Sequence, residues 1–273
     1  MSAAPLILDR VTRVTPLGIR FWDEVTSSPV LVPLWVVGYF VSRPDRRFQP
    51  VRNHSNVYAF HGLPGMRAVE YGAGDAAFWS AQAPRPFEIE VQDPSGQFLP
   101  ARFTALVPFR GIFELPASPP LLGLPGVPLY SGPARPITPG LAAIRLEVFE
   151  APGRPAAFAR LEAEYSPLTA PARGMSDAQG RATLLFPYPE PIEPAGGSPP
   201  TAPGVPLQQQ VWPVRIQAWY SPAAPPPDLP DLASFFAQRP APLWTDAARS
   251  QPFSETSIQF GRETGQVLFV TPS

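Results

Sequence analysis

Short segments in which apolar and polar residues alternate dominate the first part of the chain. Residues 87–92 (FEIEVQ) alternate strictly, which is the period of a strand with one buried face. The turn at 93–96 (DPSG) follows, where proline presets φ and glycine suits the fourth position. Residues 98–107 then supply an antiparallel partner. Aromatic and β-branched residues predict further strands at 17–23, 34–41 and 57–60, and the segment 75–83 predicts a short helix.

The same alternation returns after residue 140. It predicts strands at 143–149, 158–165, 181–186 and 211–220, and a terminal hairpin of 256–260 with 266–270. A turn at 176–180 (SDAQG) precedes the third of these strands. A short helix is expected within 228–238, with Asp231 as its N-cap.

Proline is unusually frequent and separates the two groups of strands. The chain has 42 prolines and 20 glycines among 273 residues. Proline lacks an N–H group and clashes inside helices, so this composition favours short strands and long connections. We predict an all-β chain of two β-sandwich modules, of the immunoglobulin or transthyretin type. The modules span 10–115 and 141–273, a proline-rich linker covers 116–140, and a Pro/Gly-rich insertion occupies 187–208.

Charge and cysteine content exclude several classes of function. The net charge is −1 and every cation is an arginine, so nucleic acid is not expected as a partner, because it requires a basic face. There is no cysteine, which excludes disulfides and thiolate chemistry. No apolar run approaches the ~20 residues of a membrane span, and residues 1–21 lack the apolar core of a signal peptide. We therefore expect a cytoplasmic protein without membrane insertion.

No residue set in the sequence specifies a reaction. The two histidines are His54 and His61, and His61 precedes a tight Gly-Leu-Pro-Gly segment where local hydrogen bonds are expected. No nucleophile elbow, zinc-binding helix or phosphate-binding loop is present. We predict no catalytic, cofactor-binding or metal-binding residue, and no cofactor.

Paired carboxylates and turn aspartates leave weaker alternatives. Glu88 with Glu90, and Glu162 with Glu164, share one face of a strand and could serve glycosidic acid–base chemistry. The same alternation is what a solvated strand face requires, and we favour that interpretation. A calcium site at Asp93 or Asp177 is a further weak alternative, because neither turn has the ligand density of a calcium loop.

The tryptophans are numerous and most are expected in the cores: Trp22, Trp35, Trp79, Trp212, Trp219 and Trp244. Trp212 and Trp219 lie an odd number of positions apart on one predicted strand, so they should face opposite sides. One of the two is then available at a surface, where an aromatic ring could anchor a partner or stack on a sugar.

The turn at 176–183 (SDAQGRAT) resembles that of the carboxypeptidase-regulatory-like, or transthyretin-like, β-sandwich family. The first module resembles accessory proteins of phage-tail-like contractile injection systems, through 57–67 (VYAFHGLPGMR), 98–103 (FLPARF) and 110–113 (RGIF). This resemblance implies a structural role in a baseplate, collar or cap, without a cofactor.

Three functions stay open. The leading hypothesis is a non-catalytic structural or adaptor component of a multiprotein particle, with other protein subunits or further copies of itself as partners. The alternative is a carbohydrate- or cell-surface-binding module that uses an exposed tryptophan. A hydrolase built on the paired carboxylates is the third.

Overall fold

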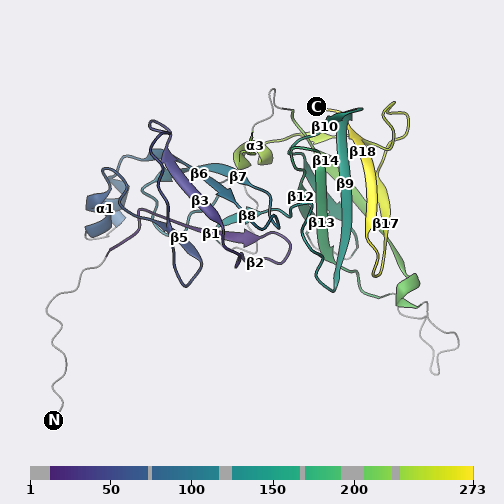
Figure 1. Cartoon of the computed structure of the whole chain (residues 1–273), viewed down its shortest axis with the longest axis horizontal. Helices are drawn as coiled ribbons and strands as arrows, with labels where there is room; N and C mark the ends of the chain where they lie inside the picture. The colour runs from purple at the N-terminus through teal and green to yellow at the C-terminus, as the bar shows by residue number, and fades with distance from the viewer. Residues whose placement is uncertain are drawn as a thin grey trace, which may run out of the picture.

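The computed structural model describes residues 13–72, 76–116, 125–166, 170–191, 206–222 and 228–272. Its regular structure is almost entirely β, which confirms the predicted fold class, and two modules lie side by side (Figure 1). The helices in these ranges are short: α1 (Arg67–Tyr71), α2 (Ala76–Ser80), α3 (Leu232–Phe236) and the 3-10 turn η1 (Leu207–Gln209). No helix in the described ranges has the length and apolar character needed to cross a membrane.

The first module packs a sheet centred on β1 against a three-stranded sheet. Its strands are β1 (Leu17–Asp23), β2 (Ser28–Pro29), β3 (Trp35–Phe40), β4 (Val51–Arg52), β5 (Val57–Phe60), β6 (Arg85–Gln92), β7 (Ala101–Val107) and β8 (Val127–Leu129). β1 runs antiparallel to β2 and β5 and parallel to β8, while β4 extends β5. β3, β6 and β7 form an antiparallel sheet, which confirms the predicted pairing within 87–107.

The second module consists of two facing five-stranded sheets. Its strands are β9 (Leu141–Ala151), β10 (Arg154–Pro155), β11 (Arg160–Glu164), β12 (Ala172–Met175), β13 (Arg181–Pro187), β14 (Val211–Trp219), β15 (Pro240–Ala241), β16 (Leu243–Trp244), β17 (Glu255–Gln259) and β18 (Thr264–Val270). β9 lies between β13 and β18 in one sheet, with β10 and β16 paired at the margins. β14 lies between β11 and β17 in the other, which β12 and β15 complete.

The strands form where alternation allows one face to be buried. In β6, Phe87 and Ile89 are fully buried, while Glu88 and Glu90 between them face outward. β9 and β14 follow the same period, and their inward residues build the core of the second module. Burial of each large aliphatic or aromatic side chain contributes about 1.5–3 kcal/mol, so the alternation determines which face of each strand packs inward.

The predicted terminal hairpin is wrong in its pairing. β17 and β18 follow each other along the chain, but β17 pairs with β14 in one sheet and β18 pairs in parallel with β9 in the other. Ile258 on β17 and Leu268 on β18 are both buried in the same core. The two strands therefore face each other across the sandwich, because this arrangement buries the apolar residues of both.

The two predicted Asp-x-x-Gly turns are confirmed. Gly96 N–H donates to the Asp93 carbonyl at 3.0 Å, and Gly180 N–H donates to the Asp177 carbonyl at 3.0 Å. Both glycines have positive φ, of 71° and 78°, which glycine adopts without steric cost. Each aspartate carboxylate also accepts backbone N–H groups of its own turn, such as Gln97 N–H to Asp93 at 2.8 Å.

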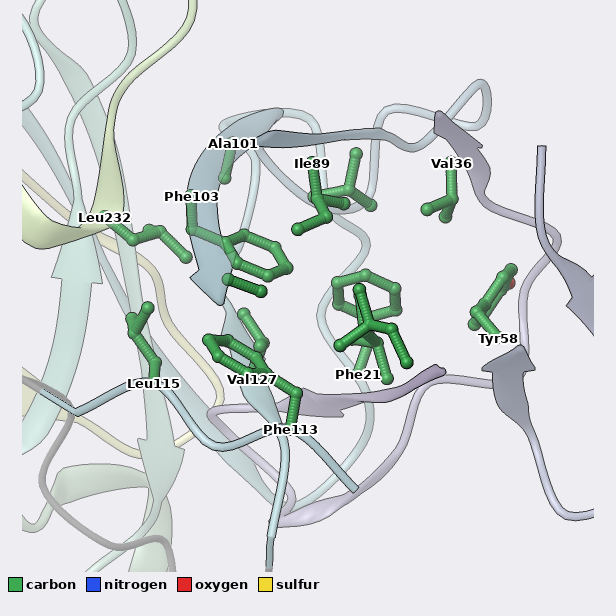
Figure 2. Close-up of a cluster of buried hydrophobic side chains, with 14 of the residues drawn as sticks. Phe21, Val36, Tyr58, Ile89, Ala101, Phe103, Phe113, Leu115, Val127 and Leu232 are labelled. Carbon is green, nitrogen blue, oxygen red and sulfur yellow. The ribbon is translucent and has the colours of Figure 1, made fainter. Parts of the chain in front are cut away.

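A helix of the second module is seated in the core of the first. α3 lies between β14 and β15 in sequence, yet Leu232 and Phe235 are buried in the first module's cluster. Figure 2 shows Leu232 beside Phe103 and Leu115. The Phe235 ring lies 4.9 Å from that of Tyr130. The Asp231 carboxylate accepts from Ser234 N–H at 2.9 Å, so the predicted N-cap is confirmed.

Part of the predicted linker 116–140 belongs to the folded body. Residues 127–129 form β8 on the edge of β1, and Tyr130 is buried in the first core. Arg135 is also buried, and its two Nη atoms donate to the Asp23 carboxylate at 2.8 and 2.5 Å. Residues 117–124 of the predicted linker and 192–205 of the predicted insertion lie outside the described residues, as do 10–12 of the first module.

Leu232→Ala tests whether α3 contributes to the stability of the first module. Leu232 is fully buried, so we expect the free energy of unfolding to fall by about 2–5 kcal/mol in urea denaturation. Leu31→Ala is the control because Leu31 is 70% exposed, and it should change the value by less than about 0.5 kcal/mol. Equal effects of the two variants would contradict the buried position of α3.

Candidate functional site

The candidate site lies on the outer face of β14. Along this strand Trp212, Val214, Ile216 and Ala218 face the core, so the residues between them face outward. Trp212 is buried in the core cluster, whereas Trp219 is half-buried on the opposite side. The prediction that these two tryptophans face opposite sides is therefore confirmed.

A groove lies along one edge of β14, between the part that pairs with β17 and the part that pairs with β15. β17 pairs with β14 at 211–215 and β15 pairs with it at 218–219, which leaves a gap between the two neighbours. The groove has a volume of about 420 Å³. Its apolar walls and polar groups come from segments far apart in sequence: Arg215, Gln217, Trp219, Pro240, Pro242, Phe253 and Ser254. Such a mixture of aromatic surface and a few polar groups is typical of a ligand site.

The Trp219 ring is held in place by Arg160. Arg160 lies directly opposite Trp219 in the β11–β14 register, and its guanidinium carbon is 4.2 Å from the ring centroid. The Arg160 guanidinium also donates to the carbonyl of Phe236, the last residue of α3, at 3.5 Å. Arg160 thus links Trp219, the aromatic ring of the groove, to α3, the helix buried in the first module.

A second depression lies on the other side of Arg215. It has a volume of about 410 Å³, and Pro213, Arg215 and Tyr165 contribute to its lining. The strand register places Glu164 and Glu255 on the two sides of Arg215. Arg215 lines both depressions, so the outer face of β14 presents one continuous surface with aromatic, cationic and anionic groups.

On the same side of this sheet, toward the first module, four charged side chains connect the two modules. Glu24 of the first module lies 3.3 Å from Arg173, and Arg173 lies 3.2 Å from Glu162. Glu162 lies 3.3 Å from the Arg160 Nε atom. Burial raises the pKa of Glu24 to about 7, although Arg173 opposes this shift by favouring the carboxylate.

The carboxylates singled out from the sequence have different surroundings. Glu88 and Glu90 accept hydrogen bonds from the Tyr39 hydroxyl at 2.7 and 2.9 Å, and Glu90 also pairs with Arg47. Glu162 is buried in the inter-module ion pairs, while Glu164 faces the second depression. Three of these four carboxylates therefore make structural contacts, and Glu164 alone of the four lines the candidate site.

The two histidines are not brought together with other polar groups of this site. His54 is exposed in the turn before β5. His61 is half-buried near Arg13 and Glu70, and its pKa is lowered mainly by burial and further by Arg13. Within the described ranges, no three His, Asp or Glu side chains lie close enough to hold a metal ion.

Sequence reasoning missed most residues around Trp219. Arg160 could have been placed on the outer face, because it alternates with buried Leu161. Its position opposite Trp219 depends on strand register, which no local pattern reveals. Pro242 and Phe253 reach the groove through tertiary contacts alone.

The fold and this face define a two-module all-β protein with an aromatic groove on its second module. No family model and no curated protein sequence matches the chain. A comparison with solved structures found the TIE protein of Bacillus anthracis, at 9% identity and a TM-score of 0.26, over 94% of this chain and 33% of that one. The chain thus spans about a third of that protein's length. It is also similar to the shaft pilin spaA of Lactobacillus rhamnosus GG, with 8% identity and a TM-score of 0.21, over 94% and 97%.

Neither structural likeness supports a functional argument, because both TM-scores are low. The resemblance to accessory proteins of contractile injection systems therefore stays a prediction.

Glu24→Gln tests the electrostatics of the module junction. The pKa of Glu24 is about 7 in the folded protein and near 4.5 when unfolded, so folding favours its protonated form. The stability from this group is present below pH 4.5 and is lost as the pH rises through 7. Relative to Glu24→Gln, the wild type should lose about 2–3 kcal/mol between pH 5 and pH 8. Urea denaturation at both pH values measures this difference, and parallel profiles would contradict the raised pKa.

Proposed function

We propose that this chain is a non-catalytic structural or adaptor component of a multiprotein particle. The observation that carries the proposal is the burial of α3, through Leu232 and Phe235, in the core of the first module. This contact fixes the orientation of the second module on the first. Two modules joined only by a linker move independently unless their interface is large and apolar. A fixed pair presents two faces at a constant distance and angle, as a part of a larger assembly requires.

Three further contacts across the junction support a rigid body. The main chain of Arg102 on β7 donates to the Pro230 carbonyl at 2.9 Å. Met175 of β12 is fully buried in the first module's cluster, and Arg173 pairs with Glu24. The modules are thus joined by apolar, main-chain and ionic contacts together. The baseplate, collar or cap of a contractile injection system is the assembly that the sequence resemblance indicates.

Sedimentation of the native chain tests this proposal. A tagged full-length chain, extracted gently from its own cells, should sediment with a large particle in a density gradient. Leu232→Ala should reduce the fraction in the heavy part of the gradient, because the orientation of the modules is less strongly fixed. Leu31→Ala serves as the control for tagging and expression. A wild-type chain found only among monomers would contradict the proposal.

A second candidate function is carbohydrate or cell-surface binding, and Trp219 is the observation that favours it. Its half-buried ring lines a groove together with Gln217 and Arg215, whose side chains can donate hydrogen bonds to sugar hydroxyls. Arg160 already stacks on the ring and keeps its orientation.

Glycan-array binding with matched tryptophan variants tests the second candidate. Trp219→Ala should lower binding about tenfold or more, because stacking on the aromatic ring is lost. Trp35→Ala removes an exposed tryptophan of the first module and should leave binding unchanged. A blank array with the wild-type chain, or equal losses in both variants, would reject this candidate.

A further inference from the structure

A separate pocket lies in the first module, at the end of β3. It has a volume of about 290 Å³ and is more enclosed than the groove beside β14. Arg43, Arg46 and Arg85 line it together with two phenylalanines, Phe40 and Phe48. The turn residues Pro64 and Gly65 form its remaining wall. The loop after β3, the turn after β5 and the start of β6 therefore meet at one point.

Aromatic rings support two of these arginines. The Arg85 guanidinium carbon is 3.9 Å from the Phe40 ring centroid, and its Nη1 atom donates to the Pro64 carbonyl at 2.7 Å. The Arg46 guanidinium carbon is 5.2 Å from the Phe48 centroid. Guanidinium groups that stack on aromatic faces lose less freedom when they bind a ligand.

The two rings are themselves fixed by the core. Phe40 packs edge-to-face on Phe87 at 5.1 Å, and Phe48 lies 6.2 Å from the same ring. Phe87 is fully buried between the sheets. Gly38 on β3 exchanges two main-chain hydrogen bonds with Phe48, at 2.9 and 2.8 Å. The aromatic base of the pocket is therefore part of the rigid sandwich.

The positive charge of this pocket is not balanced by neighbouring carboxylates. Across the described residues, no Asp or Glu lies within ion-pair distance of Arg43, Arg46 or Arg85. The adjacent Arg47 shows the contrast, since it pairs with Glu90 at 2.7 Å. Asp45 is next to Arg46 in sequence, but it is exposed and is not within that distance. Three formal positive charges thus face one small cavity in a chain whose net charge is −1.

We infer that this pocket binds the phosphate group of a small phosphorylated ligand. Guanidinium groups match phosphate oxygens with paired, charge-assisted hydrogen bonds, and a multivalent anion gains most from three of them. The apolar base of Phe40 and Phe48 excludes water from one side, which strengthens these interactions. Glycine at position 65 lets the Arg85 guanidinium approach this wall closely, because a Cβ atom there would lie 3.3 Å from the Arg85 Nη1 atom. The volume suits a compact ligand and not an extended polymer.

Calorimetric titration with pyrophosphate at constant ionic strength tests this inference. The full-length chain should show saturable binding to one site. Arg43→Gln combined with Arg46→Gln should raise the Kd about tenfold or more, since charge-assisted hydrogen bonds are removed. Both side chains are exposed in a loop, so the variant should keep the wild-type thermal midpoint and circular dichroism. Arg239→Gln combined with Arg262→Gln removes the same charge from the second module and should leave the Kd unchanged.

Separate titrations distinguish the chemistry of the ligand. Citrate at the same ionic strength should bind at least about tenfold more weakly than pyrophosphate if phosphate geometry is recognised. Citrate binding that equals or exceeds pyrophosphate binding would overturn the phosphate assignment. Absence of saturable pyrophosphate binding, or an equal Kd for the two double variants, would overturn the site. These outcomes are independent of the particle association and of the groove at Trp219.

Discussion

The first module is completed by residues that follow it in the chain by about a hundred positions. β7 is the edge strand of the three-stranded sheet, and the segment before α3 bonds to it through Arg102 and Pro230. Leu232 then enters the core beneath that edge (Figure 2), and Phe235 is buried in the same cluster. Burial of two such side chains contributes about 3–6 kcal/mol, a large share of the stability of an ordinary domain. The same contact also covers an edge that would otherwise invite pairing with another chain.

The packing of α3 against the first module also buries the charged side chains at the contact between the modules. It brings β12 and β11 against the turn after β1, so Glu24, Arg173, Glu162 and Arg160 lose water together. Charges in such surroundings must be paired or protonated, which explains both the ion pairs and the raised pKa of Glu24. Arg160, the last member of these ion pairs, stacks on the Trp219 ring. The same side chain therefore supports both the groove and the contact between the modules.

The absence of lysine has a visible consequence in the structure. Guanidinium groups stack on aromatic rings in both modules, as Arg85 does on Phe40, Arg47 on Tyr39 and Arg160 on Trp219. Lysine lacks the planar group that makes this contact. Each stacked arginine keeps its hydrogen-bonding edges free for a carbonyl, a carboxylate or a ligand. The candidate groove and the cationic pocket therefore both contain an arginine stacked on an aromatic ring: Arg160 on Trp219 in the groove, and Arg85 on Phe40 in the pocket.

The sequence by itself determined the fold class, the positions of most strands, the two Asp-x-x-Gly turns and the cap at Asp231. These features depend on alternation and turn chemistry within a few residues, as β6 and its turn at Asp93 show. It also placed Trp212 and Trp219 on opposite faces, because that follows from strand geometry alone. Only the tertiary structure decided that β17 and β18 separate into different sheets, that β8 runs parallel to β1, and that Leu232 belongs to the first core. Those outcomes depend on which apolar surfaces, distant in sequence, bury each other best, and no local pattern carries that information.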